Sequence, residues 1–365
     1  MENSFFSIYV HIPFCLKKCN YCSFYSIVVE ERGLINDYID AISKEVKLRY
    51  DIIERFLDSY RTIYFGGGTP SILDSGEIKK LLRIFYNIKE FSKLDEITFE
   101  VNPDTIDEEK LKVLKDFGVN RISIGLETSI DKYLKFLGRR YTFDVFVKKY
   151  ELVKKYFNNI NIDIIYGIYK QEEEEFLTDI EKVIELNPQH ISAYSLEIHP
   201  STPFENLVID EDKQARFYFV LKENLEKNGY IHYEISNFSL PDRYSIHNMN
   251  YWNRGNYLGF GPSSASLISS KRWKNISDVL LYNLSLDNGK IELEYEEELS
   301  ENDIMKEKLI LGLRKIEGIS INSNLYFYYQ DKITSMMDYF EIKNEKIKIK
   351  DQYLFVSNHI ISQII

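Results

Sequence analysis

The sequence predicts an α/β protein built on a parallel sheet, because apolar segments of strand length alternate with amphipathic segments of helix length. The expected strands are residues 6–12, 62–68, 96–101, 121–127, 161–167 and 190–197. The expected helices between them include residues 74–88, 107–118, 141–156 and 172–186. Nearly continuous apolar strands are typical of a sheet covered by helices, which leaves a doubly wound sheet and a full or partial (β/α) barrel open.

Residues at the ends of two expected helices support this assignment. Asp74 and Asp107 precede acidic first turns, where an aspartate side chain can accept hydrogen bonds from free backbone N–H groups. Gly118 closes the second helix, whose residues Leu111 and Leu114 lie on one face. The helices therefore begin and end where the strand pattern requires.

Polar residues at the strand ends favour the barrel. Gly66, Glu100, Glu127 and Glu197 stand at or just after the last apolar residue of four strands, and Asp163 lies inside a fifth. In a barrel, functional side chains from many strands converge at the C-terminal ends. We therefore expect a barrel, full or partial, with its site at that end.

Beyond about residue 200 the regular alternation stops. A helical stretch, residues 210–230, leads into a segment rich in Gly, Asn, Ser and aromatic residues, which we interpret as ordered loop structure near a site. We divide the chain into a core at 1–235, this aromatic segment at 236–290, packed on the barrel, and a module at 291–365. The module is expected to contain helices followed by short strands at 346–350 and 353–357.

Charge and hydropathy exclude several classes of function. The net charge of −11 argues against a nucleic-acid partner, whose affinity depends on cationic contacts. No apolar stretch approaches the roughly 18 residues of a membrane span, and the first residues lack the features of a signal peptide. We therefore expect a cytoplasmic protein, in which cysteines stay reduced.

The three cysteines of the chain, Cys15, Cys19 and Cys22, lie within eight residues in a C-x3-C-x2-C pattern. Thiolates this close suit zinc or an iron-sulfur cluster. A four-iron cluster needs four ligands, so one would come from outside the chain. The alternative is a zinc site completed by His11, although closed zinc sites normally show paired cysteine halves.

The stretch YVHIPFCLKKCNYC resembles the signature of the radical S-adenosylmethionine (SAM) superfamily. More narrowly, the chain resembles the coproporphyrinogen dehydrogenase-like branch and, within it, the HemW family of haem chaperones. This resemblance rests on the segments YFGGGTPS, EVNPDT, NRISIGLETSIDKYLKFLGRRY, NIDIIYG, YEISNFS and HNMNYW. It implies a partial (β/α)6 barrel with a helical or winged-helix-like C-terminal module. It also implies a 4Fe-4S cluster held by three cysteines, with SAM chelating the fourth iron.

The resemblance also implies which residues contact SAM. They are Tyr9, Tyr21, Gly67, Gly68, Thr69, Glu100, Glu127, Arg139 and Asp163. Position 127 departs from the family, which usually has Gln in a strand ending GVQ, whereas this chain reads GLE. Glu127 keeps acceptor oxygens but loses the amide donor and adds a charge, so its contact differs from the family's.

The segment HNMNYW is the predicted haem site. His247 offers an axial donor, Tyr251 and Trp252 offer aromatic walls, and Met249 is a weaker donor. The competing interpretation is a hydrogen-bonded packing histidine, which is the commoner role of a loop histidine beside aromatic residues.

Two functions compete. One is a haem chaperone that passes haem to an acceptor protein of unknown identity, and a peripheral contact with a membrane-bound acceptor is compatible with it. The other is oxygen-independent coproporphyrinogen III dehydrogenase, which in the resembling family carries a further cysteine, C-x3-C-x2-C-x-C, and a substantial segment before the motif. Here Ser23 and Phe24 follow Cys22, and Tyr9 lies almost at the start. We therefore expect the chaperone.

Overall fold

A computed structural model describes residues 5–365 and contains a sheet of 12 strands in the order β14-β13-β12-β11-β1-β4-β5-β6-β7-β8-β10-β9. Six neighbouring strands at its centre run parallel to one another. They are β1 (Phe6–Ile12), β4 (Tyr60–Gly67), β5 (Glu96–Val101), β6 (Arg121–Glu127), β7 (Ile160–Tyr166) and β8 (His190–Ser195). Each expected strand is therefore present, within a few residues of its predicted bounds.

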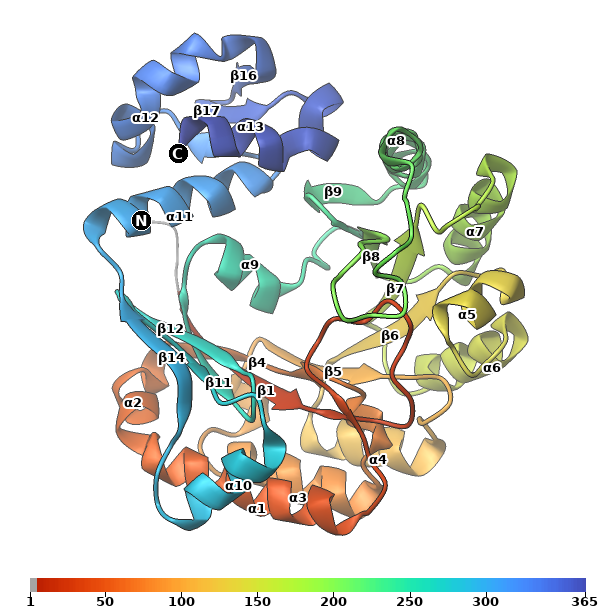
Figure 1. Ribbon diagram of the computed structural model, residues 1–365, viewed down its shortest axis with the longest axis vertical. Coiled ribbons are helices and arrows are strands. Elements are labelled where there is room, and N and C mark those ends of the chain that lie inside the picture. The colour runs from red at the N-terminus through yellow and green to blue at the C-terminus, as the bar shows by residue number, and fades with distance from the viewer. Residues whose placement is uncertain (1–4) are drawn as a thin grey trace.

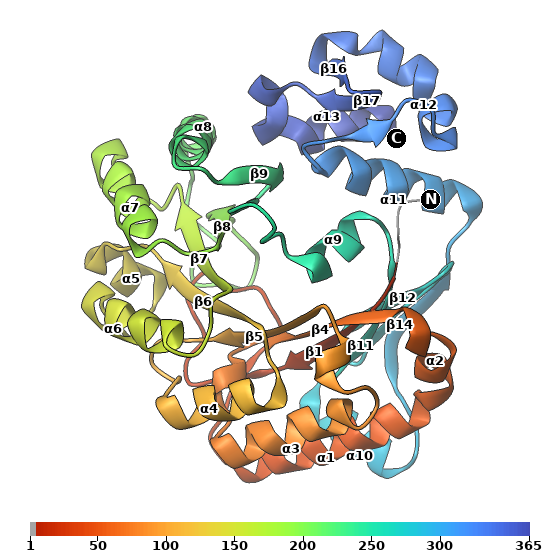
Figure 2. The same ribbon diagram turned by 180° about the vertical axis from the view of Figure 1, so that it is seen from behind.

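Helices follow these strands and cover the convex side of the curved sheet (Figures 1 and 2). They are α1 (Gly33–Leu48), α2 (Tyr50–Arg55), α3 (Ser75–Tyr86), α4 (Glu108–Phe117), α5 (Asp131–Leu137), α6 (Phe143–Lys154), α7 (Glu173–Leu186) and α8 (Glu211–Lys227). Asp74 forms a capping box at α3, Asp107 caps α4, and Gly118 ends α4 with φ of 92°. Because the two edge strands do not pair, the barrel is partial, and the predicted (β/α)6 architecture is confirmed.

The two faces of the central strands differ in chemistry. In β6, Ile122, Ile124 and Leu126 are fully buried in the hydrophobic core, and the alternate residues Arg121 and Ser123 line a cavity inside the barrel. A barrel interior is usually filled by branched apolar side chains. A polar interior indicates space for a ligand.

The sheet continues past both ends of these six strands. On one side β11 (Asn256–Phe260) pairs parallel with β1, followed by antiparallel β12 (Ala265–Ile268), β13 (Lys271–Asn275) and β14 (Leu293–Glu298). On the other side, β10 (Asn237–Ser239) and β9 (Ile231–Glu234) pair antiparallel next to β8. Residues 236–290, expected as a loop segment packed on the barrel, therefore contribute four strands, β10 to β13, to the sheet itself. Close approach at Gly259, where a Cβ would lie 2.3 Å from the Ala265 carbonyl oxygen, accompanies this tight pairing.

The same segment contains two helices, α9 (Ile246–Trp252) and α10 (Val279–Asp287). Helix α9 contacts β1, β4 and β11, and it lies on the concave side of the sheet (Figure 1). Glu96 anchors it, because its carboxylate accepts hydrogen bonds from Ile246 N at 2.8 Å and His247 N at 3.2 Å. A carboxylate at the start of a helix satisfies N–H groups that the helix itself leaves unpaired.

The C-terminal part combines helices with a small sheet. It contains α11 (Glu301–Arg314), β15 (Ile319–Ser320), α12 (Asn324–Ser335), β16 (Phe340–Lys343), β17 (Lys346–Ile349) and α13 (Ser357–Ile364). The strand expected at 346–350 is present as β17. The strand expected at 353–357 is wrong, since residues Asp351–Val356 form a 3-10 helix that buries Leu354. Within residues 5–365, no helix is both long enough and apolar enough to cross a membrane.

Candidate functional site

One cavity of about 430 Å³ runs from the C-terminal ends of the central strands into the barrel. This volume lies in the range of about 300–1,000 Å³ typical of small-molecule sites. Eleven of the sequence-predicted site residues line it: Cys15, Cys19, Tyr21, Cys22, Gly67, Gly68, Thr69, Glu100, Glu127, Arg139 and Asp163. The structure thus brings residues from the cysteine loop and four strands together around one space.

The cysteine loop is held at both ends. The short strands β2 (Phe14–Cys15) and β3 (Ile27–Val28) pair across its base. In its middle, Asn20 N donates to Leu137 O at 3.0 Å, and Asn20 Nδ2 donates to Phe136 O at 2.8 Å. These carbonyls lie in the last turn of α5, so the loop supplies hydrogen bonds that the helix end lacks. The loop is therefore fixed against the barrel before any ligand binds.

The three cysteines are free thiols. Burial raises the pKa of Cys19 to about 11 and also raises the pKa of Cys22, so neither thiol ionises readily alone, and a metal would have to displace the protons. Within residues 5–365, no three His, Cys, Asp or Glu side chains are arranged around one metal ion.

His11, the fourth donor in the zinc alternative, is committed elsewhere. Its Nδ1 lies 2.9 Å from the Tyr9 hydroxyl, and its Nε2 lies 2.9 Å from the Tyr25 carbonyl oxygen. Since the carbonyl can only accept, Nε2 carries the proton and Nδ1 accepts from Tyr9. Burial lowers the pKa of His11 to about 4, which keeps the ring neutral. Neither nitrogen is available to a metal in this arrangement.

The glycines at the end of β4, Gly67 and Gly68, pack closely on the chain segment from His11 to Cys15. A Cβ at Gly67 would lie 2.7 Å from His11 Nδ1, and one at Gly68 would lie 2.7 Å from Phe14 O and 3.0 Å from Cys15 Sγ. Gly67 has φ of +118°, a value that favours glycine. The space beside these glycines is thus filled by protein atoms. Their close packing places Thr69 beside Cys15, with Oγ1 3.5 Å from Sγ.

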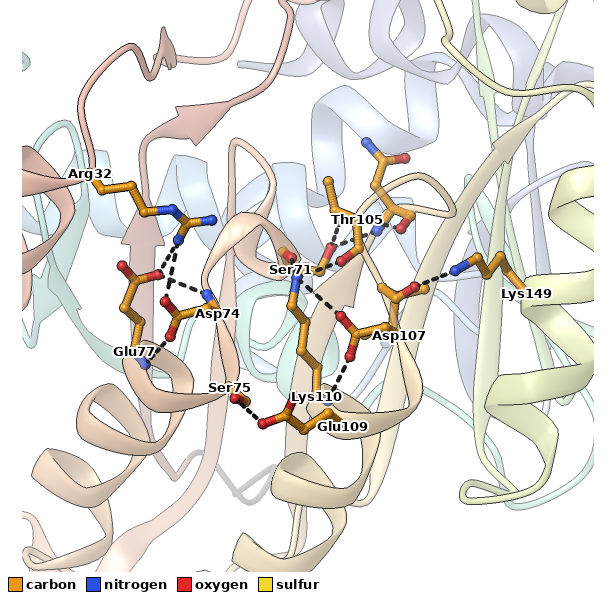
Figure 3. A network of polar contacts seen from close by, with 12 residues as sticks. Arg32, Ser71, Asp74, Ser75, Glu77, Thr105, Asp107, Glu109, Lys110 and Lys149 are labelled. Carbon is orange, nitrogen blue, oxygen red and sulfur yellow. Dashed lines mark hydrogen bonds and ion pairs between the residues drawn. The ribbon is translucent and has the colours of Figure 1, made fainter.

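A polar network holds the loop after β4 to the loop after β5 (Figure 3). Lys110 Nζ donates to Ser71 O at 2.9 Å and to Thr105 O at 2.6 Å, and Asn102 N donates to Ser71 Oγ at 2.9 Å. Ser71 follows β4, whereas Asn102 and Thr105 follow β5. The network therefore fixes the ends of two adjacent strands relative to each other.

Glu100 projects from β5 into the cavity. Its carboxylate accepts hydrogen bonds from Tyr64 Oη at 2.7 Å and from Gly67 N at 3.2 Å. Burial raises the pKa of Glu100 to about 7, against the effect of these two donors. A carboxylate with free acceptor capacity at a cavity wall is suited to bind hydroxyl groups of a ligand.

Glu127, at the end of the neighbouring strand β6, forms a buried ion pair with Arg139. Arg139 also donates from Nη2 to Tyr21 Oη at 2.7 Å and from Nη1 to Asn102 Oδ1 at 3.1 Å. Burial raises the pKa of Glu127, although the Arg139 guanidinium opposes this effect. The Glu127 carboxylate is therefore neutralised within the protein by Arg139.

Asp163 lies lower in the barrel, on β7. Ser123 Oγ donates to it at 2.8 Å and Asn161 Nδ2 at 2.9 Å, and burial raises its pKa. Both carboxylate oxygens are thus engaged, and the acid is held in one orientation facing the cavity.

Four predicted site residues do not line this cavity: Tyr9, His247, Tyr251 and Trp252. His247 on α9 is 1% exposed, with Nδ1 2.9 Å from Thr62 Oγ1 and Nε2 2.8 Å from the Tyr251 hydroxyl. Burial lowers its pKa to about 3. In this conformation His247 is a hydrogen-bonded packing residue, and ligation of iron would require α9 to release it.

Sequence reasoning missed several cavity residues. Arg121, Ser123, Asn161, Ser192 and Tyr194 line the inner part of the cavity together with the predicted residues. Their signal was present, since polar residues at alternate positions within otherwise apolar strands mark the inner face of a barrel.

Comparison with known proteins agrees with this geometry. Residues 9–183 match the model of the radical SAM superfamily. The chain is 35% identical over 359 residues to a protein of Lactococcus lactis named heme chaperone HemW, covering 94% of this chain and 92% of that protein. The protein of the same name from Bacillus subtilis is 34% identical over 324 residues, covering 86% and 84% of the two chains.

A solved structure supports the fold. The coproporphyrinogen III oxidase HemN of Escherichia coli, described as a radical SAM enzyme, superposes with a TM-score of 0.83 at 21% identity. The match covers 99% of this chain and 90% of that one, and at this identity it speaks for the fold alone. With the sequence matches to HemW proteins over nearly their whole length, the chain belongs to the HemW family of the radical SAM superfamily.

Proposed function

We propose that this protein is a cytoplasmic haem chaperone that binds haem and passes it to an acceptor protein, and that it carries a 4Fe-4S cluster with SAM as the ligand of the fourth iron. The observation that carries the cofactor part is the convergence of three free thiols and the side chains of four strands on one cavity. The name of the relatives at 34 to 35% identity supports the haem part.

The residues divide this work between them. Cys15, Cys19 and Cys22 would hold three irons from the fixed loop, and the cavity beside them has room for a nucleoside-sized cofactor. Glu100 is placed to accept hydrogen bonds from ribose hydroxyls at the cavity wall. In radical SAM enzymes the cluster and SAM together supply one-electron cleavage of the sulfonium. The protein orients the cofactor and limits access of water.

The ion pair of Glu127 and Arg139 would position SAM indirectly. Because Glu127 is paired, the cavity gains no uncompensated negative charge where the family has Gln. Arg139 in turn holds the Tyr21 hydroxyl, so the aromatic ring is fixed beside the cysteine loop. A planar aromatic side chain in that position can pack against an adenine base.

The alternative, coproporphyrinogen III dehydrogenase, has weaker support. The likeness to HemN concerns the fold, and Phe24 occupies the position of the fourth motif cysteine. Phe24 is 69% exposed at the cavity rim and offers no ligand. The haem location stays the predicted one, His247 with Tyr251 and Trp252, and it requires α9 to move.

Anaerobic reconstitution tests the cofactor part. The wild-type chain should bind about four irons and four sulfides, and replacing any of the three cysteines by Ala should abolish this content. Ser23→Ala, in the same loop but without a ligand role, is the matched control and should retain it. One zinc ion without sulfide in the wild type would contradict the cluster.

Parallel assays on the reconstituted protein separate the two functions. The chaperone should bind haem and should not convert coproporphyrinogen III to protoporphyrinogen IX when supplied with SAM and reductant. Multiple-turnover formation of that product would establish the dehydrogenase instead.

A further inference from the structure

Arg121 is a buried cation that makes no hydrogen bond and no ion pair to the described part of the chain. Its side chain begins β6 and points into the barrel, where it lines the inner part of the cavity, and the residue is 2% exposed. Within residues 5–365 it makes no hydrogen bond and no ion pair, and its Nε is buried and unsatisfied. A guanidinium keeps its charge in proteins and presents five N–H donors. None of these donors has a protein acceptor among residues 5–365.

The acidic groups around Arg121 are already engaged. It faces Glu96, Tyr64, Tyr233 and Asp163, which together raise its pKa although burial lowers it. Glu96 accepts hydrogen bonds from the first residues of α9, and Asp163 accepts from Ser123 and Asn161. These carboxylates balance the charge of Arg121 from a distance, but they do not occupy its donors.

The other buried arginine of the cavity, Arg139, has the hydrogen-bond acceptors that Arg121 lacks. Arg139 is also buried, yet its two Nη atoms donate to Glu127, Asn102 and Tyr21. A buried charge without partners is costly, and removal from water is normally compensated by hydrogen bonds or an opposite charge. Arg121 lines the cavity, from which a ligand could supply the missing acceptor.

We infer that Arg121 is the receptor for a carboxylate group of a ligand that enters the barrel from the cysteine-loop end. A planar guanidinium matches a carboxylate with two parallel hydrogen bonds, and its position at the inner end of the cavity suits a side arm of a larger molecule. Ser192 and Asn161 line the same region and add polar walls. The identity of the ligand rests on the proposed function: if the protein carries haem, the carboxylate is one of the propionate groups of haem.

The first test needs no haem. The full-length apo protein is heated with sodium propionate or with propionamide, its neutral analogue, at pH 7.5 and matched ionic strength. Propionate should raise the unfolding midpoint of the wild type, and propionamide should not. Arg121→Gln should lose the difference, whereas Arg140→Gln, which removes a half-exposed cation paired with Asp104, should keep it. Equal effects of the two compounds on the wild type overturn the site, even if Arg121→Gln fails to fold.

The second test identifies the ligand. The wild type should bind haem roughly 10- to 100-fold more tightly than haem dimethyl ester, the range expected for a charge-assisted hydrogen bond. Arg121→Gln should bind both forms equally. Equal binding of both by the wild type overturns haem as the ligand. If propionate stabilises the wild type but neither haem form binds, the carboxylate site stands and the haem function fails.

Discussion

Glu100 gives the sharpest test of the cavity's electrostatics. Its pKa of about 7, against about 4.3 for an unperturbed Glu, means that the folded state holds the proton more tightly than the unfolded state. The corresponding stability is fully present below about pH 4 and is lost as pH rises to about 7. If Glu100 were completely buried, its shifted pKa would contribute roughly 3 to 4 kcal/mol to the free energy of unfolding at low pH. About 2 kcal/mol of this contribution would be lost between pH 5.5 and 8.

Screening by solvent reduces this figure, because Glu100 is only half-buried. We therefore expect the wild-type apo protein to lose about 1 kcal/mol more stability between these pH values than Glu100→Gln, which cannot titrate. The assay is urea unfolding followed by tryptophan fluorescence at both pH values. Other buried acids, such as Glu234, are common to both chains and cancel. The exposed variant Glu292→Gln should behave as the wild type, and identical pH dependence in the wild type and Glu100→Gln would refute the reasoning.

Two further predictions concern the loop and the helix. Gly68→Ala should sharply reduce the iron content after reconstitution, because its Cβ would lie 2.7 Å from Phe14 O and 3.0 Å from Cys15 Sγ, whereas Gly33→Ala, with open space around it, should not. Normal iron binding by Gly68→Ala would show that the loop can shift without cost. His247→Ala should weaken haem binding and change the haem absorption spectrum with the cluster intact, and His359→Ala should do neither. Unchanged haem affinity and spectrum in His247→Ala would remove that residue from the haem site.

The core of the fold could be predicted because burial leaves a clear pattern. The six parallel strands are apolar on their outer face, and helix caps such as Asp74 and Gly118 mark the intervening helices. The added strands were missed because they are short and polar, as in β14 with its sequence LEYEEE. The stretch at 353–357 has the composition of a strand, but it follows β17 directly and folds into a 3-10 helix that packs Leu354.

The site was predictable where a motif specifies it and not where tertiary contacts do. The cysteines and glycines follow a recognisable spacing, and they meet at one cavity. For Arg121, the alternation of polar and apolar residues in β6 indicates only that the side chain faces the barrel interior, and not that it lacks a hydrogen-bond partner there. His247 contacts Thr62, which lies 185 residues away in the sequence, and Tyr251, which lies one helix turn away. Only the folded structure shows that both of its ring nitrogens are engaged in these hydrogen bonds.

The open barrel leaves two sheet edges, and each edge has a feature that hinders pairing with a strand of another molecule. Edge strand β14 bears four glutamates, and Lys271, Arg272 and Lys274 of β13 form ion pairs with them across the strands. At the other edge, the segment after α11 covers the backbone of β9. Ile316 N donates to Tyr233 O at 3.1 Å, and the backbones of Glu234 and Lys315 form an isolated antiparallel β-bridge. Free edges invite aggregation through strand addition. The C-terminal module thus also protects the solubility of the barrel, and a chain truncated before residue 314 should self-associate through β9.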